Sequence, residues 1–343
     1  MNKRKFLQAL VATGVTSGGV ILVAQRLLRP GSPPAPSIGT ATVPAVDPAP
    51  ELAVSNPQEE FELVMLQENE LHPGFKHSER EKQQSEVVIE QLPNETLDEY
   101  LEKIRNFDAD FKTDIFLNET NQKLLPTLAR LDRVQNFVGH ANFNLIGFEE
   151  SLYFARNCSE IGKFEAAELA FIEEIFNADA KSYGFFGEKI TPELNNRVNQ
   201  KDVQKIAGSG HYLIKGESLT HYQQIKKDVG DELTLTSGIR NNIKQMHLFL
   251  AKAFQSDGNL SLASRSLAPP GDSFHDVGDF DVGKIGMGES NFTADFSQTH
   301  EYQRLIRLGY VDIRYTDTNT FGVRYEPWHI KVSEHEDCCH NHV

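Results

Sequence analysis

The stretch SFHDVGDFDVG, residues 273–283, places a histidine and two aspartates around one glycine. His275 precedes Gly278, and Asp279 and Asp281 follow it, the second in an FDV run that is typical of the start of a short strand. A turn at the glycine would bring imidazole and carboxylate together, and Zn²⁺ binds both. Taken alone, the pattern is more typical of an ordinary turn, because aspartate and glycine are common turn residues.

A second stretch, FGVRYEPWHI at 321–330, supplies what a zinc site would still need. A catalytic zinc has three protein ligands, an open position for water and a general base near that water. His275, Asp281 and His329 would form the ligand set, and Glu326 would be the base. Glu326 and His329 are an odd number of residues apart and would face opposite ways on a strand, so Pro327 must break the strand there.

Arg240 and Trp328 can each be read either as site residues or as ordinary surface or core residues. The alternation in ELTLTSG predicts a strand that ends at Ser237-Gly238, and helical spacing begins at Ile239, which places Arg240 on the first turn of a helix. A helix N-terminus does not favour a cation, so Arg240 is either a surface residue or a donor aimed into a site. Trp328 either walls a substrate pocket or fills the core.

The composition describes a globular, acidic chain. Its 343 residues are 39% hydrophobic and 24% charged, enough for a sizeable core, and 34 basic residues stand against 49 acidic ones. The first 29 residues hold five of the basic side chains and no acidic one, so the rest carries 29 basic against 49 acidic residues. Nucleic acid is therefore an unfavourable partner.

The N-terminal segment, residues 1–29, is predicted to be an export signal or a membrane anchor. MNKRK is a positive n-region, and residues 6–24 form a moderately apolar run that is long enough to span a membrane. NKRKFLQ resembles a twin-arginine signal with Lys3 in place of the first arginine, so we expect an exported protein, periplasmic or anchored facing the cell wall. Residues 30–57 form a Pro-rich linker, and residues 58–94 are polar and unassigned.

Residues 95–205 are predicted to be a helical region. LDEYLEKIRNF repeats its apolar residues on one helical face, and FEAAELAFIEEIF at 164–176 is the strongest such pattern. His140 and Cys158 in this region are expected to be core residues rather than ligands. The chain has only three cysteines, Cys158, Cys338 and Cys339, which are too few for a disulfide framework.

Four motifs together resemble the zinc D-alanyl-D-alanine carboxypeptidase family, which includes the vancomycin-resistance carboxypeptidases and shares its fold with the amino-terminal domain of hedgehog. The motifs are SGIRNNIKQ (237–245), SFHDVGDFDVG (273–283), HEYQRLIRLGYVDIRY (300–315) and EPWHIKV (326–332). The resemblance implies an α+β catalytic domain over residues 206–333, with a central antiparallel sheet, preceded by the mainly helical region.

The resemblance also implies roles for individual residues. It makes His275, Asp281 and His329 the zinc ligands and Glu326 the catalytic base. It assigns substrate contacts to Arg240, Ser273 and Gln245, with Arg240 expected to hold a substrate carbonyl or carboxylate and to assist catalysis. Trp328 stays a candidate substrate contact from its own residue type, not from the resemblance.

The chain departs from the family at one position. The family usually places its aspartate four residues after the glycine, whereas Asp281 lies three after Gly278, and Val282 in the expected place cannot bind metal. Either the turn is one residue shorter or Asp279 is the ligand. Asp281 is favoured because FDVG copies the start of the family's strand.

The implied reaction is the removal of the terminal D-alanine from peptidoglycan stem peptides, with Zn²⁺ activating water and Glu326 accepting its proton. Two alternatives are an LD-carboxypeptidase or cross-link endopeptidase of the same fold, and a non-catalytic protein that binds the cell wall. The tail, residues 334–343, concentrates metal-binding side chains, and it is either a second metal site or a solvated tail. These side chains are His335, Cys338, Cys339, His340 and His342.

Overall fold

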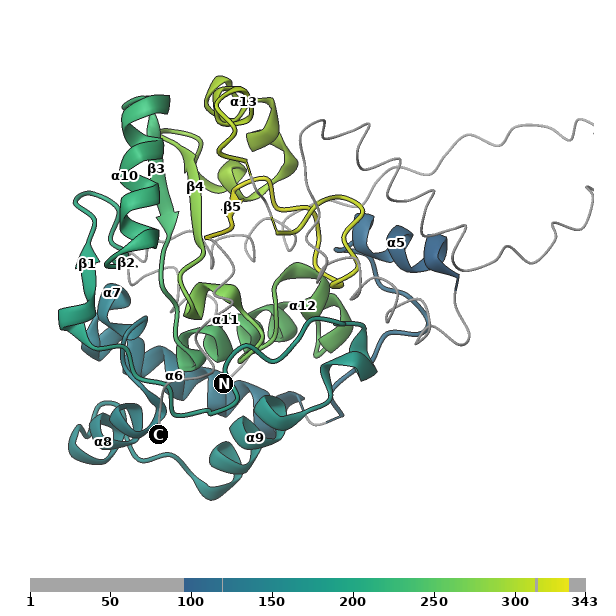
Figure 1. Cartoon of the computed structure of the whole chain (residues 1–343). Helices are drawn as coiled ribbons and strands as arrows, with labels where there is room; N and C mark the ends of the chain where they lie inside the picture. The colour runs from purple at the N-terminus through teal and green to yellow at the C-terminus, as the bar shows by residue number, and fades with distance from the viewer. Residues whose placement is uncertain (1–95, 119, 312–313, 333–343) are drawn as a thin grey trace, which may run out of the picture.

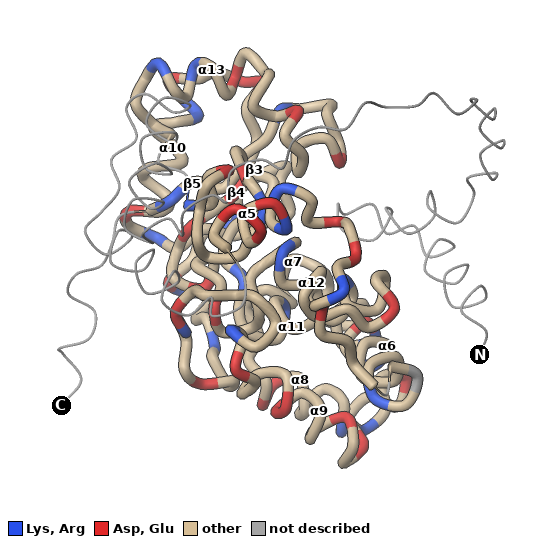
Figure 2. The backbone as a smooth tube through the Cα atoms, turned by 90° about the vertical axis from the view of Figure 1, so that its right-hand side faces the viewer, with Lys and Arg blue, Asp and Glu red and all other residues tan. Residues whose placement is uncertain are grey.

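The structure is a computed structural model that describes residues 96–118, 120–311 and 314–332. The predicted export segment, linker, polar segment and tail (1–29, 30–57, 58–94 and 334–343) lie outside these residues. Within the described ranges, no helix is both long and apolar enough to cross a membrane. Basic and acidic positions are interspersed along the described backbone (Figure 2).

Helices dominate the first half of the described chain and strands enter after it (Figure 1). The α-helices are α5 (Leu97–Arg105), α6 (Leu125–Val138), α7 (His140–Phe143), α8 (Phe148–Asn157), α9 (Ala166–Asn177), α10 (Glu217–Val229), α11 (Asn242–Gln255), α12 (Leu260–Ser266) and α13 (His300–Arg307). Short π or 3₁₀ turns are η1 (Thr120–Leu124), η2 (Ala180–Tyr183), η3 (Gln200–Asp202), η4 (Phe274–Asp276), η5 (Gly288–Phe292) and η6 (Ala294–Gln298).

A three-stranded antiparallel sheet carries the segment from which the site is built. Its strands are β3 (Leu233–Ser237), β4 (Phe280–Lys284) and β5 (His329–Ile330), in the order β3-β4-β5. A separate antiparallel hairpin pairs β1 (Val203–Lys205) with β2 (Tyr212–Ile214). The α+β architecture with an antiparallel sheet that the resemblance implies is therefore present, and a helical region precedes it.

One face of this sheet packs in an apolar core, and the other face carries the polar side chains of the site. Leu235 pairs with Val282, and Phe280 pairs with Ile330, so these side chains share one face, which packs against α10 and α13 in an apolar core. Asp281 lies on the other face of β4, and its pairing with His329 puts both side chains on that face. Strand alternation thus separates the core side of the sheet from the polar side.

The helical region shares its core with the helices that follow the sheet's first strand. Side chains of α6, α8 and α9 pack in one apolar cluster with α11 and α12, and Figure 1 shows α11 and α12 between these helices and the sheet. Tyr315, Phe321 and Val323, which lead into Glu326, also belong to this cluster. The core therefore crosses the predicted boundary at residue 205.

Residues 178–202, inside the predicted helical region 95–205, contain only the short turns η2 and η3. One local prediction needs correction. Helix α11 begins at Asn242, with Asn241 as its N-cap accepting a hydrogen bond from the Lys244 N–H. Arg240 therefore precedes the cap rather than lying on the first helical turn.

Replacing Phe171 by alanine tests whether the helical region and the sheet unfold together. Phe171 lies on α9 in the shared core, only 2% exposed, so its loss should lower the free energy of unfolding by about 3–5 kcal/mol. Trp328, the only tryptophan, lies in the core beside the sheet, so its fluorescence reports on that part. We expect fluorescence and far-UV circular dichroism to shift together to lower urea concentration.

The matched control is Phe137→Ala on α6, where the side chain is 52% exposed, and it should move the urea midpoint little. If Phe171→Ala shifted the dichroism transition and left the fluorescence transition in place, the two parts would be independent bodies and a single core would be excluded.

Candidate active site

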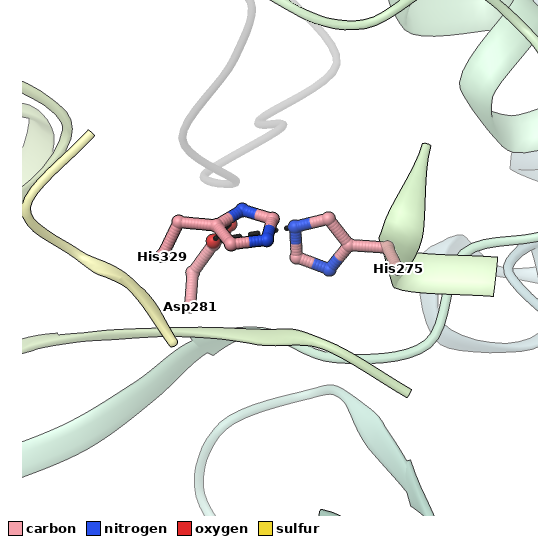
Figure 3. A group of neighbouring side chains, drawn as sticks. All are labelled: His275, Asp281 and His329. Atoms are coloured by element: carbon pink, nitrogen blue, oxygen red, sulfur yellow. Dashed lines mark ion pairs between the residues drawn. The ribbon is translucent and has the colours of Figure 1, made fainter. Parts of the chain in front are cut away.

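Three side chains from three segments meet on the polar face of the sheet (Figure 3). Asp281 is the second residue of β4, His329 begins β5 directly opposite it, and His275 lies in the turn η4 before β4. All three are at most 3% exposed. The structure therefore brings together the three residues that the sequence nominated as a ligand set.

The distances within this group suit a single cation. His275 Nε2 lies 3.2 Å from Asp281 Oδ1, and His329 Nδ1 lies 3.4 Å from the same oxygen. One ligand atom from each residue can be chosen so that all lie within 4.8 Å of one another. His275 Nε2 and Asp281 Oδ1 are buried and have no hydrogen-bond partner among the described residues, so their lone pairs remain available.

The remaining ring nitrogens of both histidines are held by fixed partners. His275 Nδ1 lies 2.9 Å from the Gly238 carbonyl oxygen, which can only accept, so Nδ1 carries the proton and Nε2 presents a lone pair. His329 Nε2 lies 2.9 Å from Asp279 Oδ2, which leaves Nδ1 facing Asp281. Outer partners of this kind fix the ring orientation of metal-binding histidines.

Asp279, the alternative ligand, is occupied elsewhere. Its Oδ2 accepts from Arg314 Nε at 2.8 Å as well as facing His329, and its Oδ1 accepts from the Val332 N–H at 2.9 Å. Asp279 thus supports His329 from behind instead of joining the group. Val282 is fully buried in the apolar core, in keeping with its inability to bind metal.

Burial and neighbouring charges shift the pKa values of the three side chains in different directions. Burial alone would raise the pKa of Asp281, but the neighbouring His275 and His329 hold it well below its usual range. Burial lowers the pKa of His329, yet the hydrogen bond with Asp279 and the nearby carboxylates of Asp281 and Glu326 outweigh burial and raise it. Burial and the charge of Arg240 lower the pKa of His275.

Glu326 approaches the group through a tight turn. The His329 N–H donates to the Glu326 carbonyl oxygen at 3.1 Å, which closes a turn with Pro327 at its second position, where proline is favoured. Glu326 Oε2 thereby lies 3.5 Å from His329 Nδ1. The expectation that Pro327 breaks the strand and turns both side chains toward one place is confirmed.

Arg240 also faces the group. Its N–H donates to the His275 carbonyl oxygen at 3.3 Å, and its side chain senses the charges of Asp281 and Glu326. Its Nε is buried and lacks a hydrogen-bond partner among the described residues. Of the two readings left open by the sequence, the structure favours a donor aimed into the site.

The other three residues predicted to contact substrate are all buried but differ in what they contact. Ser273 is 4% exposed and directly precedes η4. Gln245 Nε2 donates to the Ala268 carbonyl oxygen at 2.6 Å, while its buried Oε1 has no partner among the described residues. Trp328 is 2% exposed and packs edge-on against Phe292 in the sheet's core. Trp328 therefore packs in the core beside the sheet.

Sequence reasoning missed two neighbours of the group. Burial lowers the pKa of His211, between β1 and β2, to about 4, and its interactions with Arg240, His275 and Asp281 place it beside the site. The Tyr315 ring meets the His329 ring at 5.1 Å between centroids. Tyr315 ends the motif 300–315, which suggested no role for it, and no motif contains His211.

Comparison with known proteins places the site within one family segment. Residues 215–333 match the model of VanY, the D-alanyl-D-alanine carboxypeptidase family. Two solved structures are similar to 38% of this chain, and the similar part covers 77% of each of those chains. One is a zinc-bound mutant of the vancomycin-resistance D,D-pentapeptidase VanY from a VanB-type cassette, with 23% sequence identity and a TM-score of 0.30. The other is VanYB in complex with D-alanine-D-alanine, with 21% identity and a TM-score of 0.31. No curated protein gives a significant match.

Replacing Asp279 by asparagine tests its supporting role. Arg314 is 6% exposed and would lose its charged partner, so the free energy of unfolding at pH 7 should fall by about 3–5 kcal/mol. Arg314 and His329 outweigh burial and hold the pKa of Asp279 well below its usual range. Its contribution is therefore complete above the unfolded pKa of about 4 and is lost as the pH falls toward the folded value.

Urea titrations at pH 7 and pH 3 should then show a large difference between wild type and Asp279→Asn at the higher pH and a smaller one at the lower pH. The exposed Asp295, replaced by asparagine, is the control. Equal stabilities of the two variants at pH 7 would show that Asp279 does not support the site.

Proposed function

We propose that the VanY-type segment, residues 215–333, works as a zinc-dependent D-alanyl-D-alanine carboxypeptidase on peptidoglycan stem peptides. One observation carries the proposal. His275, Asp281 and His329 converge in the segment that matches the family, with Glu326 and Arg240 beside them. The carboxypeptidase function that the sequence resemblance implies is thus supported by the family match and by the geometry of this chain.

The donor set fits zinc. Two imidazole nitrogens and one carboxylate oxygen leave a fourth, open position, as in catalytic zinc sites. Ligands of a tetrahedral zinc lie roughly 3.4 Å apart, close to the 3.2 and 3.4 Å that separate Asp281 Oδ1 from the two ring nitrogens. The buried lone pairs of His275 and Asp281 have no other partner, which is the state that a ligand set presents to a cation.

Each side chain of the site then has a distinct task. Zinc, when bound, supplies a Lewis acid that makes water more acidic and polarises the carbonyl of the bond to be cut. Glu326 accepts the proton of the attacking water and delivers it to the leaving amine. Arg240, whose buried Nε lacks a partner, donates to a carbonyl or carboxylate oxygen of the peptide.

The choice among related peptidases rests on the family match. The matched model describes D-alanyl-D-alanine carboxypeptidases, so removal of the terminal D-alanine is the reaction we propose. Digestion of purified muropeptides followed by mass spectrometry tests this choice: loss of one D-alanine from pentapeptides supports it. Cleavage of tetrapeptides or cross-links alone would instead support the LD-carboxypeptidase or endopeptidase alternative. The complete set of site residues speaks against a non-catalytic wall-binding protein.

Replacing Glu326 by glutamine separates chemistry from metal binding. Glutamine keeps the size of the side chain but cannot accept the proton, so release of D-alanine from a pentapeptide ending in D-Ala-D-Ala should slow by on the order of a hundredfold or more. Zinc content, measured by atomic emission, should stay near that of wild type. His275→Ala is the companion variant, and it should lose most of the zinc because a ligand is gone.

Wild-type turnover by Glu326→Gln at unchanged zinc content would make Glu326 a structural residue. Full zinc retention by both His275→Ala and His329→Ala would remove these histidines from the metal site.

A further inference from the structure

A second arginine approaches the site from the segment 320–326, which we call the strap. The guanidinium carbon of Arg324 lies 4.6 Å from the centroid of the Phe107 ring and 5.0 Å from that of Trp328. Stacking of this kind holds the flat cation by its faces. The in-plane N–H groups at its edge remain free to donate.

No donor of the Arg324 guanidinium has a hydrogen-bond partner among the described residues, and its Nε is buried. The nearest carboxylate oxygen, Glu326 Oε1, lies 3.9 Å from Nε, beyond hydrogen-bonding distance. Leaving a buried donor unsatisfied costs free energy, so such a group in a folded protein needs an explanation.

Three other buried and half-buried arginines show the usual behaviour. Arg130 bonds to Glu168, Arg265 to Asp114 and Arg314 to Asp279. Arg240 and Arg324 differ from these three because their side chains make no hydrogen bond among the described residues. The charges of Asp281 and Glu326 act on both guanidiniums, and the charge of Asp108 acts on Arg324 as well.

The position of Arg324 is fixed by packing that the family segment does not contain. Tyr100 on α5 donates to the Thr320 carbonyl oxygen at 3.1 Å, which ties α5 to the strap and places Phe107 against Arg324. Gly322 has φ +97°, and a Cβ there would lie 2.2 Å from the Gly184 carbonyl oxygen. The strap therefore tolerates little displacement, and 20% of the Arg324 side chain still reaches solvent.

We propose that Arg324 is a specificity residue that binds a second carboxylate of the substrate, one inside the peptide and separate from its C-terminal carboxylate. The proposal rests on the proposed function, since it concerns the peptide bound at that site. A planar guanidinium with free edge donors matches a carboxylate with two parallel hydrogen bonds. The preferred substrate is thus a peptide with an acidic group close to the bond that is cut.

Glu326 supplies the competing explanation for Arg324. At 3.9 Å, Arg324 could act only through the charge of Glu326, in which case it would alter the cleavage of every substrate alike. A contact with a substrate carboxylate affects only peptides that carry this group. The two explanations therefore differ in selectivity between substrates, and not in overall rate.

The test uses two forms of one stem pentapeptide ending in D-Ala-D-Ala, with its internal carboxylates either free or amidated. We expect wild type to cleave the acidic form with a kcat/KM about tenfold or more above that of the amide, the size of a charge-assisted contact. Arg324→Met should bring this ratio close to one. Arg324→Lys keeps the charge without the flat fork and should give an intermediate ratio.

Arg197→Met is the control, because Arg197 is 64% exposed and pairs with Glu150, and it should keep the wild-type ratio. A ratio near one in wild type, or a ratio that Arg324→Met leaves unchanged, would overturn the proposal.

Calorimetry provides a readout that is independent of turnover. The tetrapeptide products, acidic and amidated, are titrated into Glu326→Gln protein with and without Arg324→Met. The acidic product should bind about tenfold or more tighter only when Arg324 is present. If wild type cleaved neither pentapeptide, the proposed function would fail, whereas equal binding of both products to the Glu326→Gln protein would reject the role of Arg324 alone.

Discussion

The pairing of β4 with β5 is the constraint on which the site depends. Asp281 stands directly opposite His329 in this pairing, so two candidate ligands share one face without help from any loop. Their neighbours Phe280 and Ile330 point the other way into the core, which ties the register to apolar burial. A slip by one residue would turn the ligands toward the apolar core and the core residues toward the polar face, so the forces that fold the sheet also set the site.

Other segments of the molecule hold the remaining site residues in place around Asp281 and His329. Gly238, at the end of β3, fixes the ring of His275, and Asp279 fixes the ring of His329. The strap that carries Arg324 and Glu326 lies on the core built by the helical region. The helical region is therefore part of the framework of the site, although the family match begins only at residue 215.

The sequence could predict those features that depend on short spacing and residue chemistry. The residue types and separations of His275, Asp281, Glu326 and His329 were sufficient to nominate them, and strand parity alone required the turn at Pro327. The start of α11 was misplaced because apolar periodicity continues through Ile239, while the cap is decided by the Asn241 side chain.

Contacts between distant segments carried no local signal. The support that Asp279 gives to His329, the approach of His211 and the stacking of Arg324 between Phe107 and Trp328 all arise from tertiary packing. The burial of Trp328 likewise depends on α13 and the turns before it, which a lone tryptophan in a motif does not reveal.

X-ray absorption at the zinc edge of the purified, zinc-loaded protein tests the central claim most directly. The account predicts a first shell of nitrogen and oxygen atoms at about 2.0–2.2 Å, with two imidazoles and no sulfur. Sulfur at about 2.3 Å would place the metal on cysteines such as Cys338 and Cys339 instead. A shell without imidazole would contradict the assignment of His275 and His329.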